Sequence, residues 1–219
     1  MVKANKEIHI EVVSDIVCPW CYVGKKQLEK SLKYLKYENI IFKIIWQPFE
    51  LNPNFPKDGI NRKKYLKLKF GDNQWEQSAM AKSLLNSGKE VGISFNFNSI
   101  KIMPNSRIIH AIIEVSKNKN KEKFLIEKLF QDFFENGINI SNKEYLTKLS
   151  NKLKLNKKII LDCLNDKNNS LIAKKEKKYI EIGVSSVPCF IINEKFAISG
   201  AQGEKNFTKF IKMIVKNYI

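Results

Sequence analysis

The chain has 219 residues, of which 43% are hydrophobic, so it can bury the core of one domain or of one domain with a large insertion. Its formal net charge is +17, but the excess is lysine spread along many segments, and arginine occurs only at Arg62 and Arg107. Arginine can form paired hydrogen bonds to bases and phosphates and lysine cannot. With so little arginine, we expect no specific nucleic-acid binding and only weak attraction to acidic partners.

Targeting signals are missing from the sequence given. No run of 18 apolar residues is present, and residues 1–7 contain no hydrophobic signal region. We therefore expect no membrane insertion and a cytoplasmic location. Four cysteines are few for a fold held by disulfides, and in a reducing compartment a close pair of cysteines is typical of a catalytic site.

The first predicted strand, residues 7–13, leads into the motif Cys18-Pro19-Trp20-Cys21 at the start of a predicted helix. A sulfur at the first turn of a helix meets unpaired N–H groups and the positive end of the dipole, which favour the thiolate. Pro19 suits the first helical position, so we expect Cys18 at the N-cap and Cys21 one turn inside. Cys18 would then attack disulfides and Cys21 would resolve the product.

Two other interpretations of the cysteine pair are a zinc site and a structural disulfide. A zinc site needs four ligands, and the remaining candidates show no ligand spacing: His9, His110, Cys163 and Cys189. We therefore expect no metal. A bridge across so short a loop would remove little entropy from the unfolded chain. Dithiol–disulfide chemistry is the favoured interpretation.

The middle of the chain is mainly helical. The helix that starts at the cysteines is predicted to run to Tyr37, and a strand over residues 40–46 completes a right-handed crossover unit. Loop residues follow at 51–59, and the period is helical from there to about residue 181. Ser141, three residues before a glutamate, has the spacing of a capping box.

Strand character returns at residues 189–192 and 196–198, which read as a hairpin, and a final helix is predicted over 204–217. A proline before a central strand is unusual because it cannot donate to the ladder. A trans proline at the strand entrance is the usual case, but the strand–hairpin–helix order that follows favours a cis bond between Val187 and Pro188, with the Val187 backbone free to pair with an extended substrate beside the cysteines.

The chain resembles the FrnE-like branch of the DsbA family of thioredoxin-fold oxidoreductases over nearly its whole length. Two stretches carry the resemblance, SDIVCPWCYVGK at residues 14–25 and GVSSVP at 183–188, the second followed by SGAQ at 199–202. Further landmarks lie between them in the same order: PFELNP at 48–53, Tyr65-Leu66, Lys69-Phe70-Gly71, FNF at 95–97, PNS at 104–106 and His110.

The resemblance implies an α/β thioredoxin fold interrupted by a large, all-helical insertion domain. The thioredoxin-like domain is predicted at residues 1–52 and 182–219, and the insertion at residues 53–181. No dissociable cofactor is implied beyond a redox-active Cys18–Cys21 disulfide. Expected partners are protein disulfides and thiols, together with a reductant of the thioredoxin or glutathione type.

The predicted site falls into two groups of residues. The catalytic group is Cys18, Pro19, Trp20, Cys21 and Pro188. The substrate-binding group is Phe49, Met103, His110 and Val187, in which the role of His110 rests on the resemblance. The proton acceptor stays open between Glu11 and Asp15, and Cys189 is interpreted as a small buried hydrophobic residue.

A glutathione-dependent transferase or isomerase is the alternative function. Kappa-class glutathione transferases and 2-hydroxychromene-2-carboxylate isomerases share the implied architecture, but they typically have serine in place of the first cysteine and lack the second. Both Cys18 and Cys21 are present here. The same two thiols disfavour a redox-inactive binding module.

Overall fold

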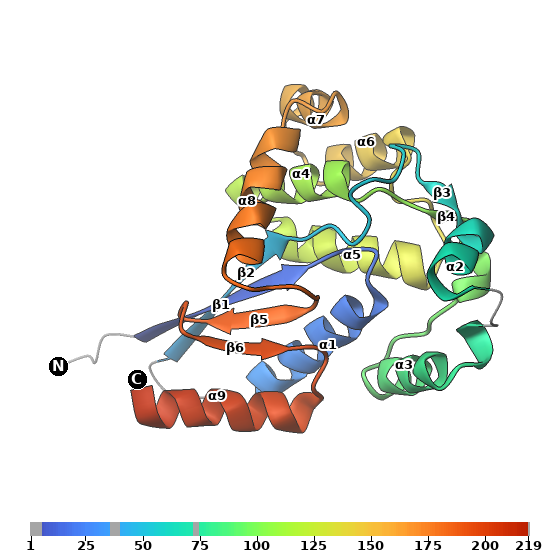
Figure 1. Ribbon diagram of the computed structural model, residues 1–219. Helices are drawn as coiled ribbons and strands as arrows, with labels where there is room; N and C mark the ends of the chain where they lie inside the picture. Colours follow the sequence, from blue (N-terminus) through green and yellow to red (C-terminus); the bar gives the residue numbers. More distant parts are fainter. Residues whose placement is uncertain (1–5, 36–39, 72–74, 219) are drawn as a thin grey trace.

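The protein is described by a computed structural model that covers residues 6–35, 40–71 and 75–218 (Figure 1). Within these ranges the main sheet has four strands in the order β2-β1-β5-β6. Strands β1 (Lys6–Ser14) and β2 (Ile40–Pro48) are parallel, whereas β5 (Cys189–Ile192) runs antiparallel to both β1 and β6 (Phe196–Ser199). This strand order agrees with the predicted thioredoxin fold.

The predicted crossover unit consists of β1, α1 (Pro19–Tyr34) and β2. Helix α1 ends at Tyr34, three residues earlier than predicted, because the backbone of Leu35 leaves the helical conformation (φ −85°, ψ 69°). Residues 36–39 lie outside the described ranges. The hairpin β5–β6 and the final helix α9 (Glu204–Tyr218) follow as predicted.

The two faces of the sheet carry different residues because side chains alternate along a strand. Val12 pairs in register with Trp46 on one side and Phe190 on the other, and all three belong to the core that α1 and α9 cover. Val13 and its partner Cys189 belong to a second, smaller cluster on the opposite face. Tyr179 of α8 completes that cluster, so α8 packs against this face.

The segment between β2 and β5 is mostly helical but not wholly so, which corrects the prediction of an all-helical insertion. Strand β3 (Ile60–Asn61) pairs antiparallel with β4 (Ile102–Met103). Each strand has only two residues, too few to show a period-two pattern, and the partner lies far away in the sequence. The proposed boundaries of the insertion, 53 and 181, stay a prediction.

Seven α-helices and three short 3-10 helices lie in the described part of this segment. Their bounds are α2 Arg62–Phe70, η1 Trp75–Gln77, α3 Ala79–Glu90, η2 Phe97–Ser99, α4 Arg107–Ser116, η3 Lys117–Lys119, α5 Glu122–Phe134, α6 Lys143–Lys152, α7 Lys157–Leu164 and α8 Asn169–Glu181. The predicted cap at Ser141 is wrong by one residue. Asn142 caps α6 instead, because its Oδ1 accepts the N–H of Tyr145 (2.9 Å).

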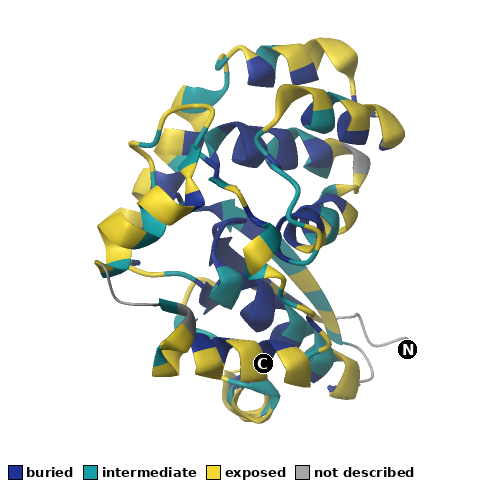
Figure 2. Cartoon of the chain, turned by 90° about the vertical axis from the view of Figure 1, so that its right-hand side faces the viewer, coloured by how far each residue is buried: buried dark blue, intermediate teal, exposed yellow. Residues whose placement is uncertain are grey.

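Helix α5 ties the insertion to α1, the helix that carries the cysteines. The Tyr22 ring stacks on Phe130 with centroids 5.0 Å apart, and its hydroxyl donates to Glu135 (2.7 Å). The buried ammonium of Lys25, in the second turn of α1, pairs with Glu127 of α5. Figure 2 shows that the buried residues continue from the sheet into these helices. The start of α1 is therefore held between the sheet and α5.

Candidate active site

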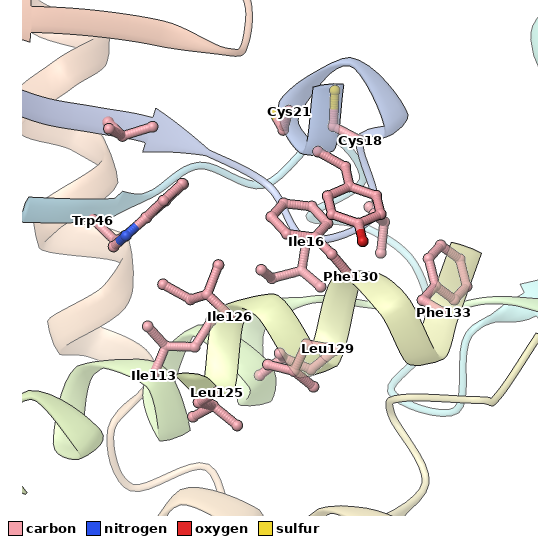
Figure 3. Packing of buried hydrophobic residues seen from close by; sticks show 14 of the residues in the cluster. Ile16, Cys18, Cys21, Trp46, Ile113, Leu125, Ile126, Leu129, Phe130 and Phe133 are labelled. Carbon is pink, nitrogen blue, oxygen red and sulfur yellow. The ribbon is translucent and has the colours of Figure 1, made fainter. Parts of the chain in front are cut away.

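Cys18 and Cys21 lie at the first turn of α1, beside the buried apolar cluster (Figure 3). Cys18 is the N-cap residue and Pro19 follows it at the start of the helix, where its missing N–H costs nothing. The N–H of Cys18 donates to the carbonyl of Asp15 (3.1 Å), and the N–H of Cys21 to the carbonyl of Cys18 (3.1 Å). Both cysteines are free thiols.

The two sulfurs differ in their surroundings. Cys18 is 5% exposed, whereas Cys21 is fully buried at 0%. Burial raises the pKa of the Cys21 thiol well above its ordinary value, and the neighbouring Cys18 raises that pKa further. The Ser14 side chain and the Asp15 backbone act in the opposite direction. Cys21 therefore stays protonated near neutral pH, as suits the inner thiol of the pair.

The start of β5 lies against Cys18. The Val187–Pro188 peptide bond is cis, and the Val187 carbonyl oxygen lies 3.7 Å from Cys18 Sγ. The Pro188 carbonyl accepts the N–H of Gly200 (2.7 Å), which holds the strand entrance in place. A Cβ atom on Gly24 would lie only 3.1 Å from Pro188 Cγ. Glycine at this position therefore allows α1 and the entrance of β5 to approach closely.

A cavity of about 290 Å³ opens beside Cys18. Its walls include five residues of the predicted site, namely Cys18, Pro19, Trp20, Met103 and Val187. The other walls come mainly from the insertion and are largely apolar or aromatic: Leu51, Tyr65, Leu66, Phe70, Trp75, Met80, Leu84, Phe97, Ile100 and Phe134. The size is near the lower end for sites that take small ligands or single side chains.

Two basic residues and no acidic residue occur among the described residues that line this cavity. Arg62 packs over the rings of Trp75 (5.9 Å) and Phe97 (5.7 Å), and Lys69 donates to the hydroxyl of Tyr65 (3.0 Å). Sequence reasoning considered Phe97 as a possible groove residue but missed Arg62, Tyr65, Lys69 and Trp75. The landmark residues at 65–66 and 69–70 were the available signal, because they lie on the same short helix α2.

Phe49 and His110, predicted to bind substrate, are not among the described residues that line the cavity. His110 is buried at 5% exposure, and its Nε2 lies 3.2 Å from the carbonyl oxygen of Phe49. The same Nε2 lies 3.5 Å from Asp15 Oδ1. The two residues thus lie together behind the β1–α1 connection instead of facing Cys18 from the insertion.

The two open candidates for proton acceptor lie in different places. Asp15 is fully buried, and its carboxylate accepts the N–H groups of Val17 (3.2 Å) and Leu51 (2.8 Å). Glu11 accepts the hydroxyl of Tyr179 (2.7 Å) beside α8. Asp15 is the one next to the cysteines, since its own carbonyl bonds to the N–H of Cys18.

The other two cysteines are packed away from this site. Cys189 is 6% exposed, and Cys163 is fully buried with its sulfur accepting from Asn168 (3.0 Å). Burial raises the pKa of both thiols. In the described ranges no group of three or more His, Cys, Asp and Glu residues is arranged to hold a metal. No described helix is both long and apolar enough to cross a membrane.

Comparison with known proteins gives a match over most of the chain. Residues 9–212 match the family of DSBA-like thioredoxin domains. The uncharacterized protein YwbO of Bacillus subtilis strain 168 is 30% identical over 210 residues, which cover 93% of this chain and 96% of the relative. The likeness therefore extends through the insertion as well as the strands.

Two solved structures have the same fold at low sequence identity. A probable DsbA oxidoreductase from Streptomyces coelicolor superimposes with a TM-score of 0.86 at 23% identity, covering 97% of this chain and 92% of the other. The cytosolic disulfide reductase DsbM from Pseudomonas aeruginosa, solved with GSH, gives a TM-score of 0.66 at 12% identity, covering 95% and 99%. At these identities the comparison concerns the fold alone.

Proposed function

The chain belongs to the family of DSBA-like thioredoxin domains, and we propose that it exchanges disulfides with protein substrates through Cys18 and Cys21. The observation that carries this proposal is the position of the Cys18 sulfur. It lies at the N-terminus of α1, on the wall of the 290 Å³ cavity and 3.7 Å from a backbone carbonyl. A nucleophile, a substrate-sized space and a backbone acceptor thus occur together.

The exchange proceeds in two steps. The Cys18 thiolate, favoured by the N–H groups at the start of α1, attacks one sulfur of a substrate disulfide, and the other substrate sulfur leaves as a thiolate. Cys21 then loses its proton and attacks Cys18 Sγ, which breaks the mixed disulfide and forms the Cys18–Cys21 bond. Two electrons pass from the enzyme dithiol to the substrate disulfide, and the reverse sequence oxidises a substrate dithiol.

The surroundings of Cys18 favour a polypeptide substrate. The Val187 carbonyl can accept an N–H from an extended chain bound beside the sulfur, and Trp20 and Met103 supply apolar contact on the cavity wall. We assign Pro188 to holding this edge, because its carbonyl bonds to Gly200. Phe49 and His110 have no contact with substrate in this proposal.

The electrons move between sulfurs, so the reaction needs no dissociable cofactor. A thiol of the thioredoxin or glutathione type would reduce the Cys18–Cys21 disulfide after each turnover. The P. aeruginosa reductase was solved with GSH, which by analogy supports glutathione as the reductant. Its description as cytosolic supports a cytoplasmic location for this chain. Nucleic acid and membrane have no part in the reaction.

Reduction of insulin by the protein, with a thiol reductant supplied, tests the proposal. Cys18→Ser and Cys21→Ser should each abolish turnover, and Cys21→Ser alone should accumulate a mixed disulfide on Cys18, because escape needs the second thiol. Cys163→Ser removes a buried thiol outside the site and should leave turnover unchanged. Robust glutathione transfer to an electrophile, or chromene isomerisation, that survives Cys21→Ser would establish the alternative function instead.

A further inference from the structure

The hydroxyl of Ser14 is buried at the end of β1 without a partner. Ser14 is 3% exposed, and its Oγ has no hydrogen-bond partner in the described part of the chain. A buried hydroxyl without a partner costs free energy, so such a group commonly binds an ordered water or has a function. The exchange steps described above use neither Ser14 nor His110.

A small cavity joins these two residues. Its volume is about 10 Å³, close to the least that holds one water molecule. Five of its lining residues have side chains that can hydrogen-bond to a water: Ser14, Trp46, Gln47, His110 and Glu114. Ile16 and Ile126, which Figure 3 shows in the apolar cluster beneath α1, are among the other walls. The space therefore suits a single, well-partnered water.

His110 lines that space and has one ring nitrogen close to acceptors. Its Nε2 lies near two acceptors, the Phe49 carbonyl oxygen (3.2 Å) and Asp15 Oδ1 (3.5 Å), so the ring proton belongs on Nε2. Neutral imidazole then offers Nδ1 as its acceptor. Once the ring is protonated, the Asp15 carboxylate stabilises the positive charge, as in other paired carboxylate and histidine groups.

The charges around this ring have both signs. The acidic groups are Asp15, Glu50, Glu114 and Glu176, from the β1–α1 connection, the β2–β3 connection, α4 and α8. Glu114 is paired with Lys117 (2.8 Å) and Lys175 (2.6 Å). Arg107 is paired with Glu50 (2.8 Å), so it does not cancel the effect of Asp15 on the imidazole.

Cys21 supplies the proton that such a group would take. Its sulfur is buried, and the Ser14 side chain lies near enough to lower its pKa against the larger effect of burial. The two side chains form no hydrogen bond in this structure, since Ser14 Oγ has no partner in the described part of the chain. Cys21 must lose its proton to attack the mixed disulfide, and solvent does not reach it directly.

We propose that Ser14, one buried water and His110 form a proton relay that activates Cys21 for the resolving step. This inference rests on the proposed function. Ser14 receives the Cys21 proton as its own hydroxyl proton passes to the water, and the water passes a proton to Nδ1 of His110. Cys21 Sγ then bonds to Cys18 Sγ, the substrate sulfur leaves with the electron pair of the broken bond, and the imidazolium later releases its proton to solvent.

A single-turnover experiment separates this step from the first. Reduced protein is mixed with a peptide disulfide and quenched with acid, and mass spectrometry follows the Cys18 mixed disulfide and the Cys18–Cys21 disulfide. Ser14→Ala and His110→Gln should each slow the decay of the mixed disulfide about 100-fold at pH 7, the scale of general acid–base catalysis. Formation of the mixed disulfide should change less than about twofold, because Cys18 needs no relay.

Matched controls are available for both residues. Ser150 is another buried serine whose Oγ has no described partner, and it lies far away on α6. His9 is the only other histidine in the sequence, and its side chain is exposed on β1. Ser150→Ala and His9→Gln should resolve the mixed disulfide at the rate of the unmodified protein.

The pH profile and the double variant distinguish a relay from a structural effect. Ser14→Ala and His110→Gln should slow the decay of the mixed disulfide less as pH rises, because Cys21 then ionises unaided. The double variant should decay no more slowly than either single variant. The relay would be overturned if the decay rate is unchanged, if it is reduced equally at every pH, or if the two reductions add. If the unmodified protein forms no mixed disulfide at all, the proposed function itself fails.

Discussion

The Cys18 sulfur lies between two walls that are held in different ways. The sheet-side wall, formed by Cys18 and Val187 and supported from behind by Gly24 and Pro188, is mostly buried and is fixed by backbone hydrogen bonds at both the β1–α1 connection and the entrance of β5. The insertion-side wall comes from α2, η1 and α3, and includes Tyr65, Lys69, Trp75 and Met80.

Figure 2 views the molecule from the side of α2 and α3, whose residues are largely exposed. An element with few buried contacts can move or change at little cost in stability. On the proposed function, we therefore expect the reaction to depend on the sheet-side wall and the choice of substrate to depend on the insertion-side wall. Four predictions test this division.

The largest effect is expected from Gly24→Val, on the sheet-side wall. A Cβ at this position would lie 3.0 Å from Phe190 Cζ and 3.1 Å from Pro188 Cγ, closer than ordinary contact. Overpacking should lower the free energy of unfolding by about 1–3 kcal/mol. It should also displace the Val187 carbonyl from Cys18 and reduce disulfide exchange at least about tenfold.

Urea unfolding and insulin reduction measure the two effects of this substitution. Ala79→Val introduces the same side chain at an exposed position of α3 and serves as the control, with both quantities near those of the unmodified protein. Full activity in Gly24→Val would show that the sheet-side wall tolerates displacement, and the division of roles would be wrong.

The second prediction concerns the pH dependence of Cys21. Because burial raises the pKa of this thiol above its ordinary value of 9.0, folding stabilises the neutral form. That stabilisation is complete below the pKa of the unfolded chain and is lost as pH rises toward the folded pKa. In Cys18→Ser, alkylation of Cys21 by iodoacetamide should therefore set in at higher pH in the folded protein than in urea. Equal profiles, read by peptide mass spectrometry, would refute the assignment of the inner thiol.

The sheet-side wall is also the part that the sequence predicts best. Pro19 at the first helical position places Cys18 at the N-cap without any knowledge of packing, and runs of β-branched residues mark β1 and β2. Local rules suffice for these features. Met103, which was predicted to bind substrate, lies on β4 in the insertion and lines the cavity together with Trp20; its role in binding stays a prediction.

The remaining features depend on contacts between distant segments. Phe49 and His110 meet each other because α4 packs behind the end of β2, and no local pattern reveals that packing. The pairing of β3 with β4 involves two residues on each side, and the position of Arg62 over two aromatic rings needs three elements to come together. The water-sized cavity beside Ser14 likewise exists only in the packed structure.

Met80→Ala should change substrate binding with little effect on chemistry. Met80 lies on the insertion-side wall and is 58% exposed, so its removal creates no buried cavity. Loss of roughly half of its apolar contact should weaken binding by about 1 kcal/mol, and KM for a peptide disulfide should rise about fivefold. The rate of Cys18 alkylation by iodoacetamide should stay unchanged. Leu85→Ala, at a similarly exposed position of α3 that does not line the cavity, is the control.

The smallest effect is expected from reversing a charge on the same wall. Lys69 is exposed at the cavity, whose described lining contains no acidic residue, so it should attract acidic peptides and repel basic ones. Lys69→Glu should raise KM for an acidic peptide disulfide at low salt and lower it for a basic one. The change should be only about threefold, because charges at the rim of a site contribute little.

Lys63→Glu makes the same charge change on α2 away from the cavity lining and controls for net charge. The difference between the two variants should shrink at 1 M salt, where the screening length is only about 3 Å. If both reversals change KM equally, selectivity arises from the overall charge of the protein, and the insertion-side wall has no specific role in it.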